Sequence, residues 1–238
     1  REIIPLFKTG DQLKLFYKTS TFVKTKEQAI KEEKQFGVEV LGDFEEYIEG
    51  EVLSIAIKAL SLSENKPLFE VNNTIFLNDL FERLETSQTV IEALKTAIYY
   101  KNQFAIDNLV EKELTSSIFA PLIKNILKLE GSLEEILKTI SPYPISQSMR
   151  DAITSLETLE QYLREKTQNA TIRYDLSLVT KYDYYEGLVF QGYLAQTPKP
   201  IVYGGSYRPL TKKYGNDILA TGFSLNTSDL LKEMITND

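Results

Sequence analysis

Hydrophobic and polar residues alternate along two early stretches of the chain, residues 13–22 and residues 35–41. An alternation with a period of two predicts strands that bury one of their faces. The segment 24–34 between them, KTKEQAIKEEK, carries charges of both signs and is typical of a solvated helix or loop. We therefore expect two strands that are joined by a polar excursion.

Further strands are predicted in the second half of the chain. Residues 172–176 alternate with polar neighbours, and residues 188–193 form an apolar run after Gly187. We expect these runs to be two adjacent strands of a sheet, with the loop 180–186 between them. The remaining predicted strands are residues 68–71, a strand that contains Gly204 and Gly205 in the stretch IVYGGSYRPL, and residues 220–225.

The middle of the chain, from about residue 78 to residue 163, has the apolar spacing of amphipathic helices. Within it, Ser132 and Glu135 form a predicted capping box at the start of one helix. Other helices are expected at 44–62, at 75–84 after the capping residues Asn72, Asn73 and Thr74, and at 227–234. The apolar stripes assigned to helix packing are Ile91, Leu94, Ala97 and Ile98; Phe104, Ile106, Leu109 and Val110; and Ile118, Leu122, Ile126 and Leu129.

The order of these elements is sheet, helices, sheet, which predicts an α+β fold built on an antiparallel sheet. We expect three segments along the chain. Residues 1–77 form the first part of the sheet core, residues 78–168 an all-helical insertion, and residues 169–238 the second part of the core.

A candidate binding site follows from the stretch KYDYYEG at 181–187, which is unusually aromatic and charged for a connection. Phenols and a carboxylate at a strand end can hold a flat, polar ligand, and Gly204 with Gly205 would let the backbone approach it closely. On the second strand, Gln35 and Glu39 project from the same face because they are four residues apart. The alternative is a tyrosine-rich turn whose rings pack on the sheet.

The composition excludes several kinds of site. Cysteine and histidine are both absent, which excludes thiolate and Ser-His-Asp catalysis and any metal site built on these ligands. A net charge of −7 without a basic stripe argues against a nucleic-acid partner. No apolar run of about 18 residues and no signal peptide are present, so we expect a soluble, cytoplasmic protein with no membrane contact. The chain opens on Arg1 rather than on a methionine, which favours a fragment.

Four motifs, in their order and spacing, resemble the catalytic core of histidyl-tRNA synthetases, a class II fold. They are QFGVEVLG at 35–42, LVTKYDYYEGLVF at 178–190, GGSY at 204–207 and ATGFSL at 220–225. The resemblance is greatest to a non-catalytic paralogue of that enzyme, the regulatory subunit of the short-form ATP phosphoribosyltransferase of histidine biosynthesis. It implies a class II synthetase-like antiparallel sheet flanked by helices, with a helical insertion.

The residues that match the synthetase's phosphate ligands have changed. As the resemblance aligns them, the enzyme's arginines fall at Val23, Thr180 and Asp229. A carboxylate at a phosphate site repels the ligand, and each lost charge-assisted contact is worth about 1.5–3 kcal/mol. The resemblance therefore implies a protein without catalytic residues, cofactor or metal. The length of the chain also leaves no room for an anticodon-binding domain.

The residues that match the synthetase's histidine pocket are retained: Gln35, Glu39, Tyr185 and Tyr207, with Gly204 and Gly205 beside them. A carboxylate facing a phenol or amide can satisfy both nitrogens of an imidazole. The acidic partner of the ligand's α-amino group would fall at or before Arg1. The alternative is a polar cluster that persists without a ligand.

The function implied by the resemblance is regulatory. We expect a subunit that binds and activates the catalytic ATP phosphoribosyltransferase subunit, helps to sense histidine, and forms a homodimer within a hetero-oligomer. One alternative is a divergent or fragmentary synthetase core that still transfers histidine. Another is an amino-acid-binding module that has no catalytic partner.

Overall fold

The computed structural model describes residues 4–8, 10–24, 29–44, 47–167, 169–180, 184–195, 197 and 199–235. The strands are β1 Leu13–Lys24, β2 Ile30–Leu41, β3 Leu68–Asn73, β4 Glu130–Gly131, β5 Thr171–Asp175, β6 Leu188–Tyr193, β7 Val202–Ser206 and β8 Ala220–Asn226. The α-helices are α1 Ile48–Leu60, α2 Ile75–Glu82, α3 Gln88–Tyr99, α4 Gln103–Glu113, α5 Ala120–Lys124, α6 Leu133–Ile140, α7 Gln147–Lys166, α8 Arg208–Lys213 and α9 Thr227–Ile235. Single 3-10 turns lie at Ile4–Leu6 and Ile126–Lys128.

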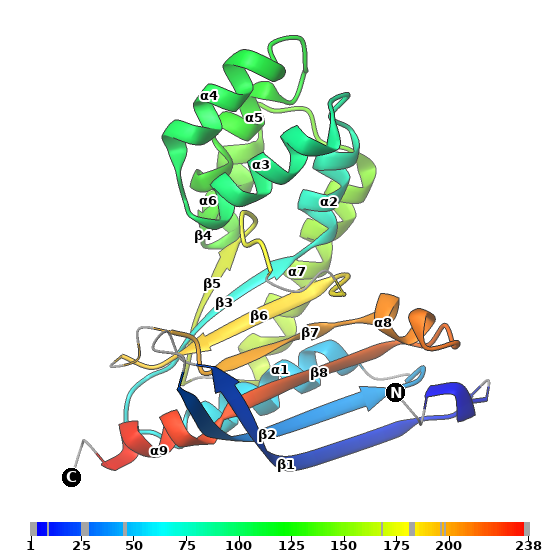
Figure 1. The fold of residues 1–238 in the computed structure, drawn as a ribbon, viewed down its shortest axis with the longest axis vertical. Coiled ribbons are helices and arrows are strands. Elements are labelled where there is room, and N and C mark those ends of the chain that lie inside the picture. The colour runs from blue at the N-terminus through cyan, green and yellow to red at the C-terminus, as the bar shows by residue number, and fades with distance from the viewer. Residues whose placement is uncertain are drawn as a thin grey trace. The chain divides into compact units, whose positions relative to one another are not determined.

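The strands are hydrogen-bonded in the order β1-β2-β8-β7-β6-β3-β5-β4 (Figure 1). The pairs β1–β2, β2–β8, β8–β7, β7–β6 and β5–β4 are antiparallel. This confirms the predicted α+β fold, in which most of the sheet is antiparallel. The expectation that β5 and β6 are adjacent was wrong, because β3, from much earlier in the chain, pairs between them.

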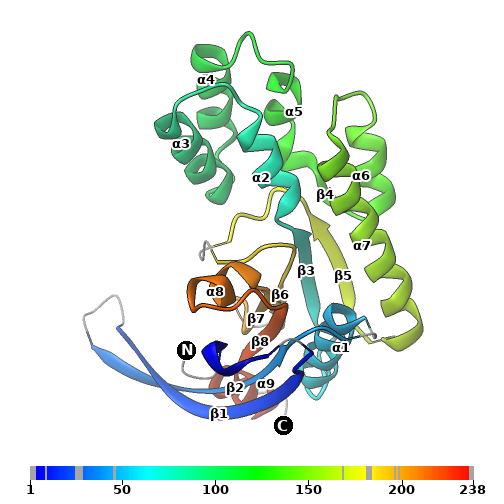
Figure 2. The same cartoon turned by 90° about the vertical axis from the view of Figure 1, so that its right-hand side faces the viewer.

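The β1–β2 ribbon is longer than the sequence pattern indicated (Figure 2). β2 begins at Ile30, which pairs with Lys24 at the end of β1, so the prediction of a helix or loop over 24–34 was wrong for Lys24 and for the last five residues. Residues 25–28 of that segment lie outside the described residues. The charged residues form a strand because β1 supplies backbone partners along its whole length, while their side chains stay in solvent.

The chain packs as two compact units. The first consists of Arg1–Glu70, Gln161–Thr171 and Tyr184–Asp238, and the second of Val71–Glu160 and Ile172–Asp183. These limits differ from the expected segment limits of 77 and 168, since residues 172–183 pack with the helices. Within the first unit, α1 packs on β8, β7 and β6.

The core of the first unit lies between α1 and one face of the sheet. Helix α1 buries residues at three- and four-residue spacing, as the apolar stripe of 44–62 predicted. The phenyl rings of Phe190 and Phe223 are buried on the strands beneath this helix. The fully or almost fully buried residues of α1 are Val52, Leu53, Ala56, Ile57 and Leu60.

The second unit is mostly helical and also contains β4 and most of β5. Ser132 Oγ accepts the N–H of Glu135 while the Glu135 carboxylate accepts the N–H of Ser132, which confirms the predicted capping box. The capping acceptor before α2 is Asn73, whose Oδ1 accepts the N–H of Ile75 at 3.1 Å. Two stripe residues are exposed: Phe104 is 78% exposed near the start of α4, and Ile118 is 68% exposed in the turn before α5. Both lie close to the start of a helix, outside its packed turns.

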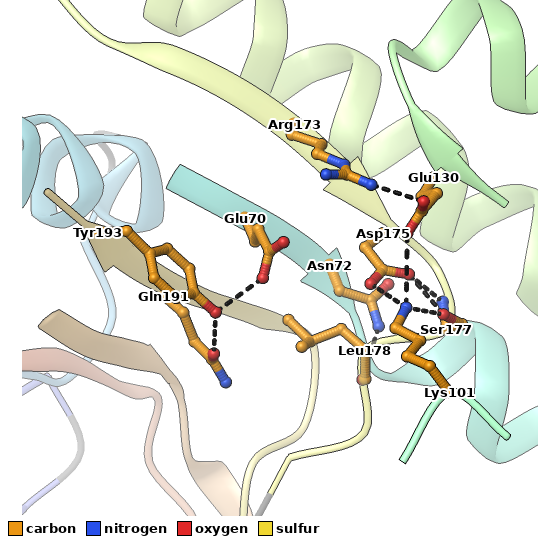
Figure 3. A network of polar contacts seen from close by, with 10 residues as sticks. All are labelled: Glu70, Asn72, Lys101, Glu130, Arg173, Asp175, Ser177, Leu178, Gln191 and Tyr193. Atoms are coloured by element: carbon orange, nitrogen blue, oxygen red, sulfur yellow. Dashed lines mark hydrogen bonds and ion pairs between the residues drawn. The ribbon is translucent and has the colours of Figure 1, made fainter. Parts of the chain in front are cut away.

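A polar network ties β5 and β4 to the start of α4 within the second unit (Figure 3). Lys101, which follows α3 with a φ of 50°, brings its Nζ to 2.7 Å from Asp175 Oδ2 and 2.6 Å from Ser177 Oγ. Glu130 lies 3.6 Å from the same Nζ and 2.6 Å from the Arg173 guanidinium. A lysine is uncommon in this left-handed conformation, and the ion pairs to Glu130 and to the buried Asp175 offset its cost.

In the part of the chain that the structure describes, no helix has the length and apolar character needed to cross a membrane.

Candidate functional site

The register of the sheet places the candidate residues on one surface of the first unit. Glu39 on β2 pairs with Gly222 on β8, and Gly222 pairs with Gly205 on β7. Residues that are paired in register point to the same side of a sheet. Gln35 shares this side with Glu39 because four residues separate them, as predicted. We call this surface the pocket face.

Glu39 and Tyr207 are in direct contact. The phenol of Tyr207 donates a hydrogen bond of 2.5 Å to Glu39 Oε2. Burial raises the pKa of the Glu39 carboxyl to about 7, although the bond from Tyr207 favours the anion and opposes this rise. Burial first, and then the Glu39 charge, raise the pKa of Tyr207, so its phenol remains a donor at neutral pH.

The side chains of the pocket face lie over glycines of neighbouring strands. A Cβ atom on Gly222 would collide with Glu39 Oε2, and one on Gly37 would collide with the ring of Tyr17. A Cβ atom on Gly205 would lie 3.0 Å from Cδ1 of Tyr185. These glycines therefore let a carboxylate and two phenol rings lie close to the sheet. We call Gly37, Gly205 and Gly222 the glycine floor.

Tyr17 is a member of this site that sequence reasoning missed. Its ring lies over Gly37, which is midway between Gln35 and Glu39 on β2. Burial, followed by the charges of Glu39 and Tyr184, raises the pKa of Tyr17 to about 12. In the sequence, Tyr17 is only one position in the alternating pattern of β1. Its place over Gly37 follows from the register in which β1 pairs with β2.

The structure brings together Glu39, Tyr17, Tyr185 and Tyr207, each linked to another member by a hydrogen bond or by electrostatic interaction. Gln35 is farther along β2, at a separation of roughly 13 Å for four strand residues. It lies opposite Thr19 and Asn226 in the register. Gln35 therefore points to the same side of the sheet as Glu39, but Tyr17 lies between the two along the strand.

Gly204 lies on the opposite face of the sheet. A Cβ atom on Gly204 would collide with the ring of Phe190 and lie 2.7 Å from the Cβ of Phe223. Ring packing in the core, not approach of a ligand, therefore accounts for a glycine at this position.

Of the loop stretch 181–187, residues 181–183 lie outside the described residues, while Tyr184 and Tyr185 stack with ring centroids 4.7 Å apart.

A second polar group lies on the pocket face, on β6 and β3 of the first unit (Figure 3). The hydroxyl of Tyr193 is 2.9 Å from Glu70 Oε2 and 2.9 Å from Gln191 Oε1. Gln191 and Tyr193 belong to this face because they follow Val189, which pairs with Gly205, at spacings of two and four residues. The pocket face is therefore polar along several of its strands.

The chemistry of the site suits a ligand that offers N–H groups. Glu39 is an acceptor at the centre, and the surrounding phenols can each donate or accept one hydrogen bond. A planar ring can also lie against the aromatic side chains. Over the described ranges, no group of three or more carboxylates is placed to hold a metal ion.

Two of the positions aligned with phosphate ligands lie in the first unit. Val23 is on β1, 38% exposed and uncharged, and it pairs with Lys31. Asp229 is in the first turn of α9, where its carboxylate lies 2.6 Å from the Nζ of Lys232. The third, Thr180, belongs to the second unit. None of these side chains carries a positive charge.

Comparison with known proteins agrees with the fold and the motifs. The chain is 32% identical over 203 residues to the ATP phosphoribosyltransferase regulatory subunit of Shouchella clausii, which covers 84% of this chain and 51% of that protein. The subunit of the same name from Acetivibrio thermocellus is 29% identical over 197 residues, covering 82% and 47%. The chain thus spans about half the length of these relatives.

A solved structure described as an ATP phosphoribosyltransferase regulatory subunit/histidyl-tRNA synthetase from Bacillus halodurans C superposes with a TM-score of 0.81. Its sequence identity is 25%, and the match covers 93% of this chain and 58% of the other. The sequence profile of the family described as histidyl-tRNA synthetase matches residues 3–230, which is most of the chain. The chain therefore belongs to the histidyl-tRNA synthetase family.

Proposed function

We propose that this chain acts as a regulatory subunit of an ATP phosphoribosyltransferase, binding and activating the catalytic subunit without itself catalysing a reaction. The observation that carries the proposal is a contrast between two sets of residues. The side chains suited to an imidazole are present and clustered around Glu39. The positions aligned with phosphate ligands, Val23, Thr180 and Asp229, carry no positive charge. Histidine can then be bound without being activated by ATP.

The names of the relatives support the same role. Proteins that match most of this chain are called ATP phosphoribosyltransferase regulatory subunits. A regulatory subunit that senses histidine needs a different affinity for it in two states of the assembly, and this does not require catalysis. The proposed partner is the catalytic ATP phosphoribosyltransferase subunit, and the proposed assembly is a hetero-oligomer that contains a homodimer of this chain.

The assembly can be tested directly. Mixing this protein with a short catalytic ATP phosphoribosyltransferase subunit should produce a larger species in size-exclusion chromatography and a higher rate of phosphoribosyl transfer. The catalytic subunit alone and an unrelated acidic protein serve as controls. An unchanged elution and rate would contradict the proposed partnership. Histidine-dependent exchange of pyrophosphate into ATP by this protein alone would instead favour the synthetase alternative.

Binding of histidine should depend on Glu39. The substitution Glu39→Gln keeps the shape of the side chain but removes the charged acceptor, so the affinity for histidine should fall at least tenfold, or by about 1.5–3 kcal/mol. Calorimetric titration of both proteins, alone and with the catalytic subunit, measures this change. Glu51→Gln, which alters only the exposed ion pair with Lys14, is the matched control. Equal affinities of wild type and Glu39→Gln would place the binding of histidine elsewhere.

A further inference from the structure

The reverse face of the sheet carries a side-chain pair directly behind the pocket. Ser206, the last residue of β7, donates a hydrogen bond from its Oγ to Glu49 Oε1. Glu49 is in the first turn of α1, on the side of the sheet opposite the pocket face. Ser206 projects to that side because it is one residue from Gly205 along the strand. The pair therefore links α1 to the strand that carries the pocket.

Ser206 is also connected to the segment that carries the pocket phenols. Its carbonyl oxygen accepts the N–H of Glu186 at 3.0 Å, and Glu186 directly follows Tyr185. The residue that follows β7 is Tyr207, which donates its N–H to Ala220 O at 2.8 Å. Ser206 is therefore adjacent to Tyr207 in the chain and is hydrogen-bonded to the backbone next to Tyr185.

The segment also lies close to the Ser206–Glu49 pair itself. A Cβ atom on Gly187 would be 3.8 Å from Glu49 Oε1 and 3.9 Å from the Cβ of Ser206. Glu49 is held firmly because the following turns of α1 are buried on the sheet. Its place at the helix N-terminus favours a carboxylate, although burial raises its pKa. Glu49 therefore provides a fixed acceptor for the hydroxyl of Ser206.

We propose that Ser206 and Glu49 are positioning residues, which set the places of Tyr185 and Tyr207 from behind the sheet without touching the ligand. This inference rests on the proposed function, because it concerns the pocket that is proposed to bind histidine. The pair acts through the backbone of β7 and the N–H of Glu186. Loss of the Ser206 hydroxyl should loosen both phenols at once.

The test compares histidine affinity in variants at a temperature where circular dichroism shows each to be folded. Ser206→Ala should weaken binding by about five- to tenfold, the effect of one hydrogen bond, and Ser206→Thr should restore it because the hydroxyl is kept. Glu49→Ala should weaken binding similarly. Glu51→Ala, in the same helix turn but in an exposed ion pair, should not. Unchanged affinity in Ser206→Ala, or no rescue by Ser206→Thr, would overturn the assignment.

A second measurement does not depend on histidine. In protein labelled with 3-fluorotyrosine, the ¹⁹F resonances of Tyr185 and Tyr207 can be assigned with Tyr185→Phe and Tyr207→Phe. Both resonances should move in Ser206→Ala and return in Ser206→Thr. If wild-type protein binds no histidine but the resonances move as expected, the proposed function fails and the positioning role stands. Resonances that stay in place in Ser206→Ala would overturn the positioning role.

Discussion

Protein with Glu39→Gln should lose less stability than wild type when the pH is raised from about 4.5 to above 7. Burial raises the pKa of Glu39 from 4.5 to about 7 in the folded protein. Below the unfolded pKa both states hold the proton, and Glu39 has no effect. Between the two values the unfolded chain releases the proton while the folded protein keeps it, so the free energy of unfolding falls as the pH rises. Above the folded pKa the loss is complete.

The expected loss from this residue in wild type is on the order of 3 kcal/mol, because its pKa rises from 4.5 to about 7 and one pKa unit corresponds to about 1.4 kcal/mol. Urea unfolding of wild type and Glu39→Gln at pH 4.5, 6 and 8 measures it, and Glu51→Gln controls for the loss of a charge. The difference between wild type and Glu39→Gln should grow with pH in favour of the amide. Parallel pH profiles would show that Glu39 is not destabilising when ionised.

The same residue is expected to weaken the folded protein and to bind the ligand. An ionised carboxylate held in a partly buried site lacks some of the hydrogen bonds that water would give. An imidazole that donates an N–H group would supply one of them. Glu39→Gln should therefore raise stability at pH 8 while lowering histidine affinity, a trade-off that is common at functional sites.

The substitution Gly222→Ala should damage both the fold and the site. The new Cβ would collide with Glu39 Oε2 and would lie 2.5 Å from the backbone oxygen of Val38. The carboxylate can rotate away, but the carbonyl is part of the β2–β8 ladder and cannot move without breaking it. Forcing extra volume into such a site costs about 1–3 kcal/mol of unfolding free energy.

Urea unfolding and histidine titration of Gly222→Ala measure the two effects. The free energy of unfolding should fall, and the affinity for histidine should fall at least as far as in Glu39→Gln, because the carboxylate is displaced. Ser224→Ala, two residues along the same face of β8, is the matched control and should be close to wild type. A free energy of unfolding equal to that of wild type would show that β2 and β8 can move apart at this point without a cost in stability.

The sequence by itself determined the local elements and the common face of part of the site. Period-two alternation located the second half of β2 and placed Gln35 and Glu39 on one face, and three- and four-residue spacing located the helices. These patterns can be recognised in the sequence because buried positions recur every two residues in a strand and every three or four in a helix. Where charged residues masked the alternation, as at the start of β2, the strand was missed.

Only the tertiary structure decided which strands are neighbours and what lies over each glycine. The placement of β3 between β5 and β6, and of the Tyr17 ring over Gly37, depends on pairing between distant segments. The same holds for Gly204, whose partner Phe190 is on the core face, and for the bond from Ser206 to Glu49. Such contacts are set by the register between strands and by the packing of helix on sheet, and neither leaves a periodic signal in the local sequence.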